Sequence, residues 1–154
     1  MPGVGSVACP KPAKGDAKRA RRRDKRAETP VISAVRTACV DRDGYCRLQF
    51  PDDGSGSSQA VQALFGACHG PSEWAHVGKA KRWKTRNMAP DARHATAHSL
   101  MLCRLHHQSD LRGYDRSAFE IEYADPTRGC DGPLRFITRA GEEYWEAGAE
   151  RTDG

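Results

Sequence analysis

The sequence predicts an α+β protein in which short helices and strands are held together by a metal ion. Apolar residues recur at helical spacing from Val31 to Cys39, and residues 119–123 and 134–138 alternate between apolar and polar. The chain also carries six Cys and six His within 154 residues. Because a domain typically has about 100–200 residues, we expect one domain with flanking segments.

The first helix is expected to begin at Thr29-Pro30, since Pro is favoured at the first helical position, and to end at Gly44. A short strand is expected over residues 45–50 and a flexible loop over residues 51–58. A helical turn over residues 60–65 is expected to follow.

A second strand is expected over residues 72–77, where the period of two places Trp74 and His76 on one face. Residues 100–111 are apolar and then helical, and the segments 119–123 and 134–138 form a C-terminal β-hairpin. The fold therefore reads as a helix, a small central unit of strands and helix, and a hairpin.

Charge divides the chain into three expected parts. Residues 1–28 contain nine Lys or Arg against three acids and are expected to form a disordered basic arm. Residues 29–140 form the folded domain, and residues 141–154, with five acids and one Arg, form an acidic tail. A basic arm attracts nucleic acid, but a solvated leader without a partner is equally compatible with the charge alone.

Composition disfavours several classes of protein. The apolar stretches are far shorter than the roughly 18–20 residues of a membrane span, and no apolar segment follows the basic N-terminus as in a secretory signal. We therefore expect a cytoplasmic protein with reduced thiols. Under these conditions a mixture of Cys and His indicates metal binding rather than a disulfide scaffold.

The metal-ligand spacing is clearest at Cys103 and His106, which form a C-x2-H pair. Cys46 and Cys68, separated by the flexible loop, are the expected second half of a four-ligand zinc site. The alternative is a set of isolated buried thiols, which we expect for Cys39 and Cys130. Cys9 is expected to be a similar thiol or an exposed one in the arm.

Several short motifs occur in a fixed order along the chain. They are Arg42-Asp43-Gly44-Tyr45-Cys46, Glu73-Trp74-Ala75-His76, His98-Ser99-Leu100-Met101-Leu102-Cys103 and His106-His107, with a later segment over residues 129–136. This order resembles the HNH endonucleases over roughly residues 31–138. The resemblance implies a ββα-metal core stapled by zinc and metal-dependent cleavage of DNA. It also implies a bacterial or phage-infected host cell and an association with phage genome processing or packaging.

The resemblance assigns roles to three histidines. His76 falls on the general base, His107 on a ligand of a catalytic divalent cation such as Mg²⁺ or Mn²⁺, and His98 on a position usually held by Asn. His98 would orient the site or act as a ligand. Ala75 stands where an acidic metal ligand is usual, so that Asp91, Asp110 or His98 would have to compensate. His106 stands where the zinc site usually has Cys.

The chemistry of histidine fits these roles. An imidazole with an unperturbed pKa of about 6.5 can accept a proton from water at neutral pH. A divalent cation stabilises the charge that develops on the departing oxygen. His69 and His94 are expected to be ordinary surface or core imidazoles.

Five basic residues follow the expected base within a span of eight and are expected to contact phosphates: Lys79, Lys81, Arg82, Lys84 and Arg86. A solvated charged loop is the alternative for this segment. For the whole chain, the competing function is a zinc-stabilised DNA-binding module that does not cleave, and Ala75 is its main support.

Overall fold

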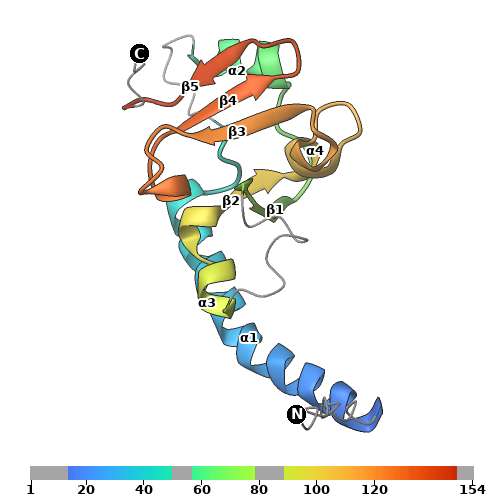
Figure 1. Cartoon of the computed structure of the whole chain (residues 1–154). Coiled ribbons are helices and arrows are strands. Elements are labelled where there is room, and N and C mark those ends of the chain that lie inside the picture. Colours follow the sequence, from blue (N-terminus) through green and yellow to red (C-terminus); the bar gives the residue numbers. More distant parts are fainter. Residues whose placement is uncertain (1–13, 50–56, 79–88, 149–154) are drawn as a thin grey trace, which may run out of the picture.

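The computed structural model describes residues 14–49, 57–78 and 89–148, which form two small antiparallel sheets with helices around them (Figure 1). The sheets are mixed with helices, as the α+β prediction requires. The helices are α1 (Lys14–Asp43), α2 (Ser57–Phe65), α3 (Pro90–Arg93) and α4 (Arg104–Gln108), with single 3-10 turns η2 (Thr96–His98), η3 (Tyr114–Arg116) and η4 (Gly129–Asp131). The strands are β1 (Ser72–His76), β2 (Ser99–Cys103), β3 (Phe119–Tyr123), β4 (Leu134–Thr138) and β5 (Glu143–Trp145).

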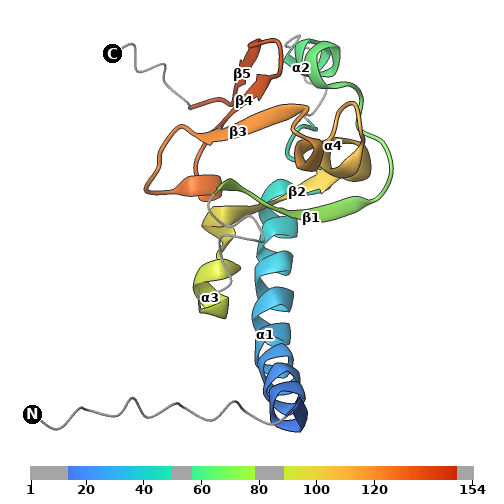
Figure 2. The same cartoon turned by 45° about the vertical axis from the view of Figure 1, so that its right-hand side comes forward.

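The two-stranded sheet pairs β1 with β2, and its two faces have different neighbours. Ala75 lies opposite Leu100, and both belong to the apolar core shared with the three-stranded sheet β3-β4-β5. His76 lies opposite Ser99 on the other face, where the Ser99 hydroxyl contacts the Cys39 thiol of α1. α1 therefore covers this second face, as Figure 2 shows.

The expected disordered arm is wrong for residues 14–28, because these residues form the first half of α1. Pro30 lies inside the helix rather than at its start. Ala, Lys, Arg and Glu are among the strongest helix formers, so the charged composition that suggested disorder also favours helix. Residues 1–13 lie outside the described part of the chain.

The C-terminal strands over residues 119–123 and 134–138 are confirmed with the expected bounds. The acidic tail is wrong at its beginning, because β5 extends the hairpin to three strands. Glu146 pairs with Arg47 at 2.6 Å and accepts the backbone N–H of Leu134 at 2.9 Å. Glu146 is therefore part of the fold. Residues 149–154 lie outside the described residues.

The expected strand over residues 45–50 is a pair of turns in its described part, residues 45–49. Gly44 has a positive φ of 65° directly after α1, a conformation that suits glycine at a helix end. The N–H of Arg47 then donates to the carbonyl of Met101 in β2. The chain thereby turns from α1 toward β2 and places Cys46 in the interior.

A buried ion network fixes the end of α1. The Asp43 side chain is fully buried, and it pairs with Arg42 at 2.6 Å and with Arg47 at 2.7 Å. It also accepts the backbone N–H of Met101 at 2.9 Å. Burial opposes ionisation of Asp43, but these hydrogen bonds outweigh it and lower the pKa of the carboxyl group.

No helix within the described ranges is both long enough and apolar enough to cross a bilayer. The longest, α1, is strongly charged along its first half.

Candidate functional site

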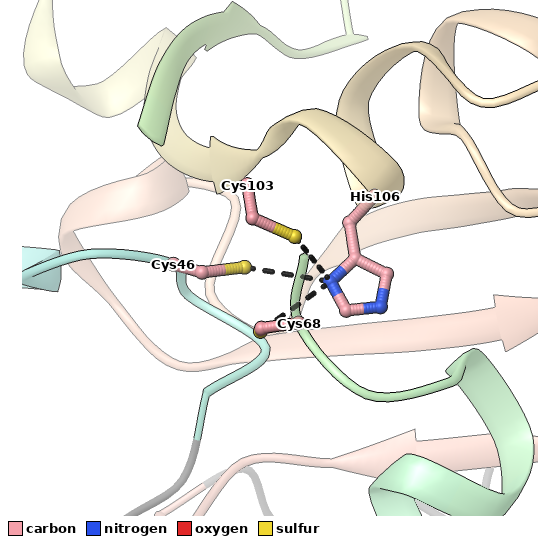
Figure 3. Close-up of side chains that lie close together, drawn as sticks. All are labelled: Cys46, Cys68, Cys103 and His106. Carbon is pink, nitrogen blue, oxygen red and sulfur yellow. Dashed lines mark hydrogen bonds between the residues drawn. The ribbon is translucent and has the colours of Figure 1, made fainter. Parts of the chain in front are cut away.

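Four side chains from distant parts of the sequence converge beside the end of β2. Cys103 ends β2, His106 lies in α4, Cys46 follows α1, and Cys68 follows α2. One donor atom from each lies within 4.8 Å of all the others. Figure 3 shows the cysteines around the Nδ1 atom of His106. Cys68 is half-buried and the other three are fully buried, so this cluster can hold a metal ion.

The distances match those of a tetrahedral zinc site. Nδ1 of His106 lies 3.2 Å from the sulfur of Cys103, 3.5 Å from that of Cys46 and 3.7 Å from that of Cys68. A zinc ion with Zn–S bonds of about 2.3 Å and a Zn–N bond of about 2.0 Å separates sulfur and nitrogen by about 3.6 Å. Three sulfurs and one imidazole nitrogen also form a common structural zinc set.

The backbone at the end of α2 selects the ring nitrogen that faces the sulfurs. Nε2 of His106 lies 3.1 Å from the carbonyl oxygens of Phe65 and Gly66. Since a carbonyl only accepts, Nε2 must carry the proton, and Nδ1 of the neutral ring is left to bind metal. Gly66 has a positive φ of 87°, and its N–H bonds to Gln62 to close the helix.

Protons are shared among these donors when the metal is not bound. Hydrogen bonds from Cys46 and Cys68 lower the pKa of Cys103, whereas hydrogen bonds to Cys103 and Cys46 raise the pKa of Cys68. Burial opposes protonation of His106, but its hydrogen bonds with Cys103 and Cys46 raise its pKa to about 10. A metal ion would displace these protons, because it binds thiolates and neutral imidazole.

His76 lies at the end of β1 on the face covered by α1. Its Nε2 lies 3.0 Å from Nδ1 of His94, and its ring packs against the Trp74 indole at 4.4 Å between centroids. Nε2 of His94 in turn lies 2.6 Å from a carboxylate oxygen of Glu28 in α1. Burial, followed by the charges of His94 and Arg93, lowers the pKa of His76 to about 4.

His107 lies in α4 between two carboxylates. Its Nδ1 lies 2.9 Å from Glu73, and its Nε2 lies 3.3 Å from Asp115. Glu73 also pairs with Arg104 at 2.8 Å. Asp110, one expected substitute for the missing acid, is instead largely exposed and pairs with Arg116 at 3.3 Å.

The burial of Ala75 explains why β1 carries its acidic residue at position 73 and not at position 75. Its side chain is 1% exposed within the apolar core, so a carboxylate at position 75 would be buried there. Glu73 lies two residues earlier on the same face of β1 and reaches His107. Asp91, the other expected substitute, is exposed after the start of α3.

His98 ends η2 and has a third, separate environment. Its Nδ1 lies 3.5 Å from the phenolic oxygen of Tyr123 in β3, and its carbonyl accepts the N–H of Val77. Burial raises the pKa of Tyr123, which keeps this hydroxyl protonated and able to donate. The three predicted histidines thus surround the ends of the β1-β2 sheet, each with different partners.

The remaining predictions divide into confirmed and undescribed residues. Cys39 and Cys130 are buried thiols, as expected, and His69 is exposed. His94 is a buried imidazole with both ring nitrogens hydrogen-bonded, as expected of a core histidine, and one of its partners is His76. Lys79, Lys81, Arg82, Lys84 and Arg86 lie outside the described residues, and so does Cys9.

Sequence reasoning missed side chains that contact the predicted histidines, namely Glu73, His94, Asp115 and Tyr123, and it missed Glu28, which contacts His94. Glu73 carried a signal, because it shares a strand face with position 75. Glu28 and His94 carried none, since they are 66 residues apart and meet only through the packing of α1. Asp115 is likewise placed by the turn η3 after α4.

No family model matches this chain, and no curated protein or solved structure matches it either.

Proposed function

We propose that this chain is a metal-dependent DNA endonuclease of the HNH type, with zinc as a structural ion. The observation that carries the proposal is the order of elements around the two-stranded sheet. His76 ends β1, His98 directly precedes β2, and His107 lies in α4, which follows β2 without a break. This order of strand, strand and helix supports a core of the kind that the sequence resemblance implies.

His76 is the residue suited to take a proton from the attacking water. Its pKa, lowered to about 4 first by burial, keeps the ring neutral at physiological pH. A neutral imidazole has one bare nitrogen that can accept a proton. As a general base it would contribute roughly 10²–10⁴-fold to the rate.

His107 and Asp115 are the best-placed ligands for a catalytic divalent cation such as Mg²⁺ or Mn²⁺. Glu73 accepts a hydrogen bond from Nδ1 of His107, and Nε2 faces the Asp115 carboxylate, so a cation held between Nε2 and Asp115 would take the place of a proton there. A carboxylate behind a ligating imidazole fixes the ring and raises its basicity. When bound, the cation would stabilise negative charge on the phosphate and on the departing oxygen.

DNA would be held through its phosphates. Arg19, Arg22 and Arg26 are exposed on α1, and their spacing of three and four residues places them along one side of the helix. The helix extends away from the sheets (Figure 1). Phosphate contacts of this kind give affinity without reading sequence. Phage genome processing or packaging is the setting that the resemblance implies for this activity.

A DNA-binding module without cleavage is the second candidate, and the burial of Ala75 favours it. The acid usual at that position is missing, and an acid introduced there would lie in the core.

Supercoiled plasmid separates the two candidates. Zinc-loaded protein is incubated with plasmid and with Mg²⁺, Mn²⁺, Ni²⁺ or additional Zn²⁺. If the chain is an endonuclease, we expect nicked or linear product with at least one of these ions, and we expect His107→Ala to lose that product. Plasmid retardation without cleavage under any ion identifies the binding module.

A further inference from the structure

Three side chains from separate elements form a continuous hydrogen-bonded chain on the α1 side of the two-stranded sheet. Nε2 of His76 lies 3.0 Å from Nδ1 of His94, and Nε2 of His94 lies 2.6 Å from Glu28. Glu28 comes from the middle of α1, and His94 directly follows α3. His94 is only 7% exposed, so the middle of the chain is shielded from water.

The chemistry of the groups fixes the direction of these hydrogen bonds. The Arg93 guanidinium lies 3.3 Å from the Glu28 carboxylate and favours its ionised form. An ionised carboxylate only accepts, so Nε2 of His94 carries a proton. In the neutral ring, Nδ1 of His94 is then bare and accepts the N–H of His76. A neutral His76 is left with a bare Nδ1.

We infer that Glu28 and His94 orient His76 and relay the proton that it accepts, with Nδ1 of His76 as the proton-accepting atom. The role of His76 as a base rests on the proposed function, whereas the order of the hydrogen bonds does not. Glu28 and His94 act through His76 and are positioning residues.

The relay is balanced in atoms and charge. Water gives one proton to Nδ1 of His76 and becomes hydroxide. The proton on Nε2 of His76 crosses the 3.0 Å hydrogen bond to Nδ1 of His94. His76 ends neutral with its proton on Nδ1, and the positive charge resides on His94 beside the Glu28 carboxylate.

The environment of His76 explains why a second carrier is useful. Among the described residues, the charged or titratable groups with the largest influence on the pKa of His76 are His94, Arg93, His107 and Asp115, and of these four Asp115 alone raises it. Burial and the other three groups lower its pKa, so the ring alone would hold a proton poorly at neutral pH. Transfer of the charge to His94, next to an ionised carboxylate, offsets this weakness.

The first test is the tautomer of His76 in the full-length, zinc-loaded protein, measured by ¹⁵N NMR of the histidine side chains. His76→Ala assigns its signals. We expect His76 at neutral pH to carry its proton on Nε2 with a bare Nδ1. A proton on Nδ1 with a bare Nε2 overturns the inference, whatever the protein does to DNA.

The second test separates orientation from relay with His94→Gln and His94→Ala. A Gln amide oxygen can accept the N–H of His76 while its NH₂ donates to Glu28, but it cannot take up the proton. His94→Gln should keep the His76 tautomer and lower the cleavage rate by roughly 10²-fold. His94→Ala should lose both the tautomer preference and the rate, and His69→Gln, at an exposed histidine, is the matched control.

The two failures are distinguishable. Wild-type cleavage that His94→Gln leaves unchanged overturns the relay. Absence of cleavage in the wild type overturns the proposed function, while the NMR tautomer still decides whether Glu28 and His94 orient His76.

Discussion

The cysteine cluster and the predicted catalytic histidines lie around the same two-stranded sheet but are built differently. Cys46, Cys68, Cys103 and His106 place four donor atoms within 4.8 Å in the interior. His76 and His107 do not converge on one point in this way. His76 bonds to His94, His107 bonds to Glu73, and both imidazoles are partly exposed.

This difference is the one expected between a site that stabilises the fold and the proposed nuclease site, which would have to admit a substrate. Buried soft ligands that converge on one point have no open position and suit a structural ion. Partly exposed imidazoles backed by carboxylates keep one ring nitrogen available for a ligand or a proton. His106 and His107 are neighbours in sequence but have different surroundings, because His106 lies in the cysteine cluster and His107 lies between two carboxylates.

Removal of the metal should have the largest effect. A small domain that places four ligands around one ion should lose cooperative unfolding when the ion is stripped, because binding free energy then contributes directly to folding. Elemental analysis should find one zinc per chain, and circular dichroism should report unfolding after chelation. Cys103→Ser should abolish zinc binding, whereas Cys39→Ala, at a buried thiol outside the cluster, should retain it.

The pH dependence of zinc binding sharpens this prediction. Thiol and imidazolium protons must leave before zinc binds, and the pKa of His106 is raised to about 10 in the metal-free cluster. Zinc uptake should therefore release protons into a weakly buffered solution, and the affinity should rise with pH. A Cys103→Ser protein that binds as much zinc as the wild type would contradict the structural site.

The ion network at Asp43 should give the next largest effect. Asp43→Asn removes the fully buried charge between Arg42 and Arg47, which keep only their less buried partners Asp131 and Glu146, and should cost roughly 3–5 kcal/mol in the free energy of unfolding. The fold lowers the pKa of Asp43, so its stabilisation is complete above its ordinary value of 3.8 and is lost as pH falls through the folded value. Chemical denaturation of the zinc-loaded protein at pH 7 measures the loss, and an Asp43→Asn protein as stable as the wild type would refute the assignment.

Substitution of Glu73 should affect the cation without affecting zinc. Glu73→Gln removes the carboxylate that bonds to Nδ1 of His107. It should lower the affinity for the activating cation by roughly 10–100-fold, because loss of a partner that orients a metal ligand commonly has this effect. The Mn²⁺ concentration for half-maximal cleavage measures this change, and zinc content serves as the internal control. Glu122→Gln, at an exposed acid of β3, is the matched variant and should leave the concentration unchanged.

Neutralisation of the α1 arginines should have the smallest effect on catalysis. Arg19, Arg22 and Arg26 changed together to Gln should weaken DNA binding similarly on all sequences. The salt slope should fall by about 0.9 for each phosphate that an arginine no longer neutralises. Fluorescence anisotropy at several salt concentrations measures the slope. The same change at Arg112, Arg116 and Arg128, exposed residues outside α1, is the control, and equal weakening by both triple variants would show no special role for α1.

The sequence predicted the cluster of three cysteines and His106 and the two late strands better than it predicted the surroundings of the other histidines. Cys103 and His106 are local partners, and strands such as 119–123 follow from alternation alone. Glu28 and His94 meet through the packing of α1 against α3, which no local spacing records. The start of α1 was missed because charge density was interpreted as disorder, although Ala, Lys and Arg favour helix.

The role of His76 is the central claim, and plasmid cleavage by zinc-loaded wild type, His76→Ala and His69→Ala tests it most directly. We expect His76→Ala to lose roughly 10²–10⁴-fold in rate, because a general base acts on the barrier. Its zinc content and DNA affinity should stay unchanged, and His69→Ala should cut like the wild type. Wild-type cleavage should persist from pH 8 to about pH 5 and decline near pH 4, where His76 becomes protonated. A His76→Ala protein that cuts as fast as the wild type would contradict the account.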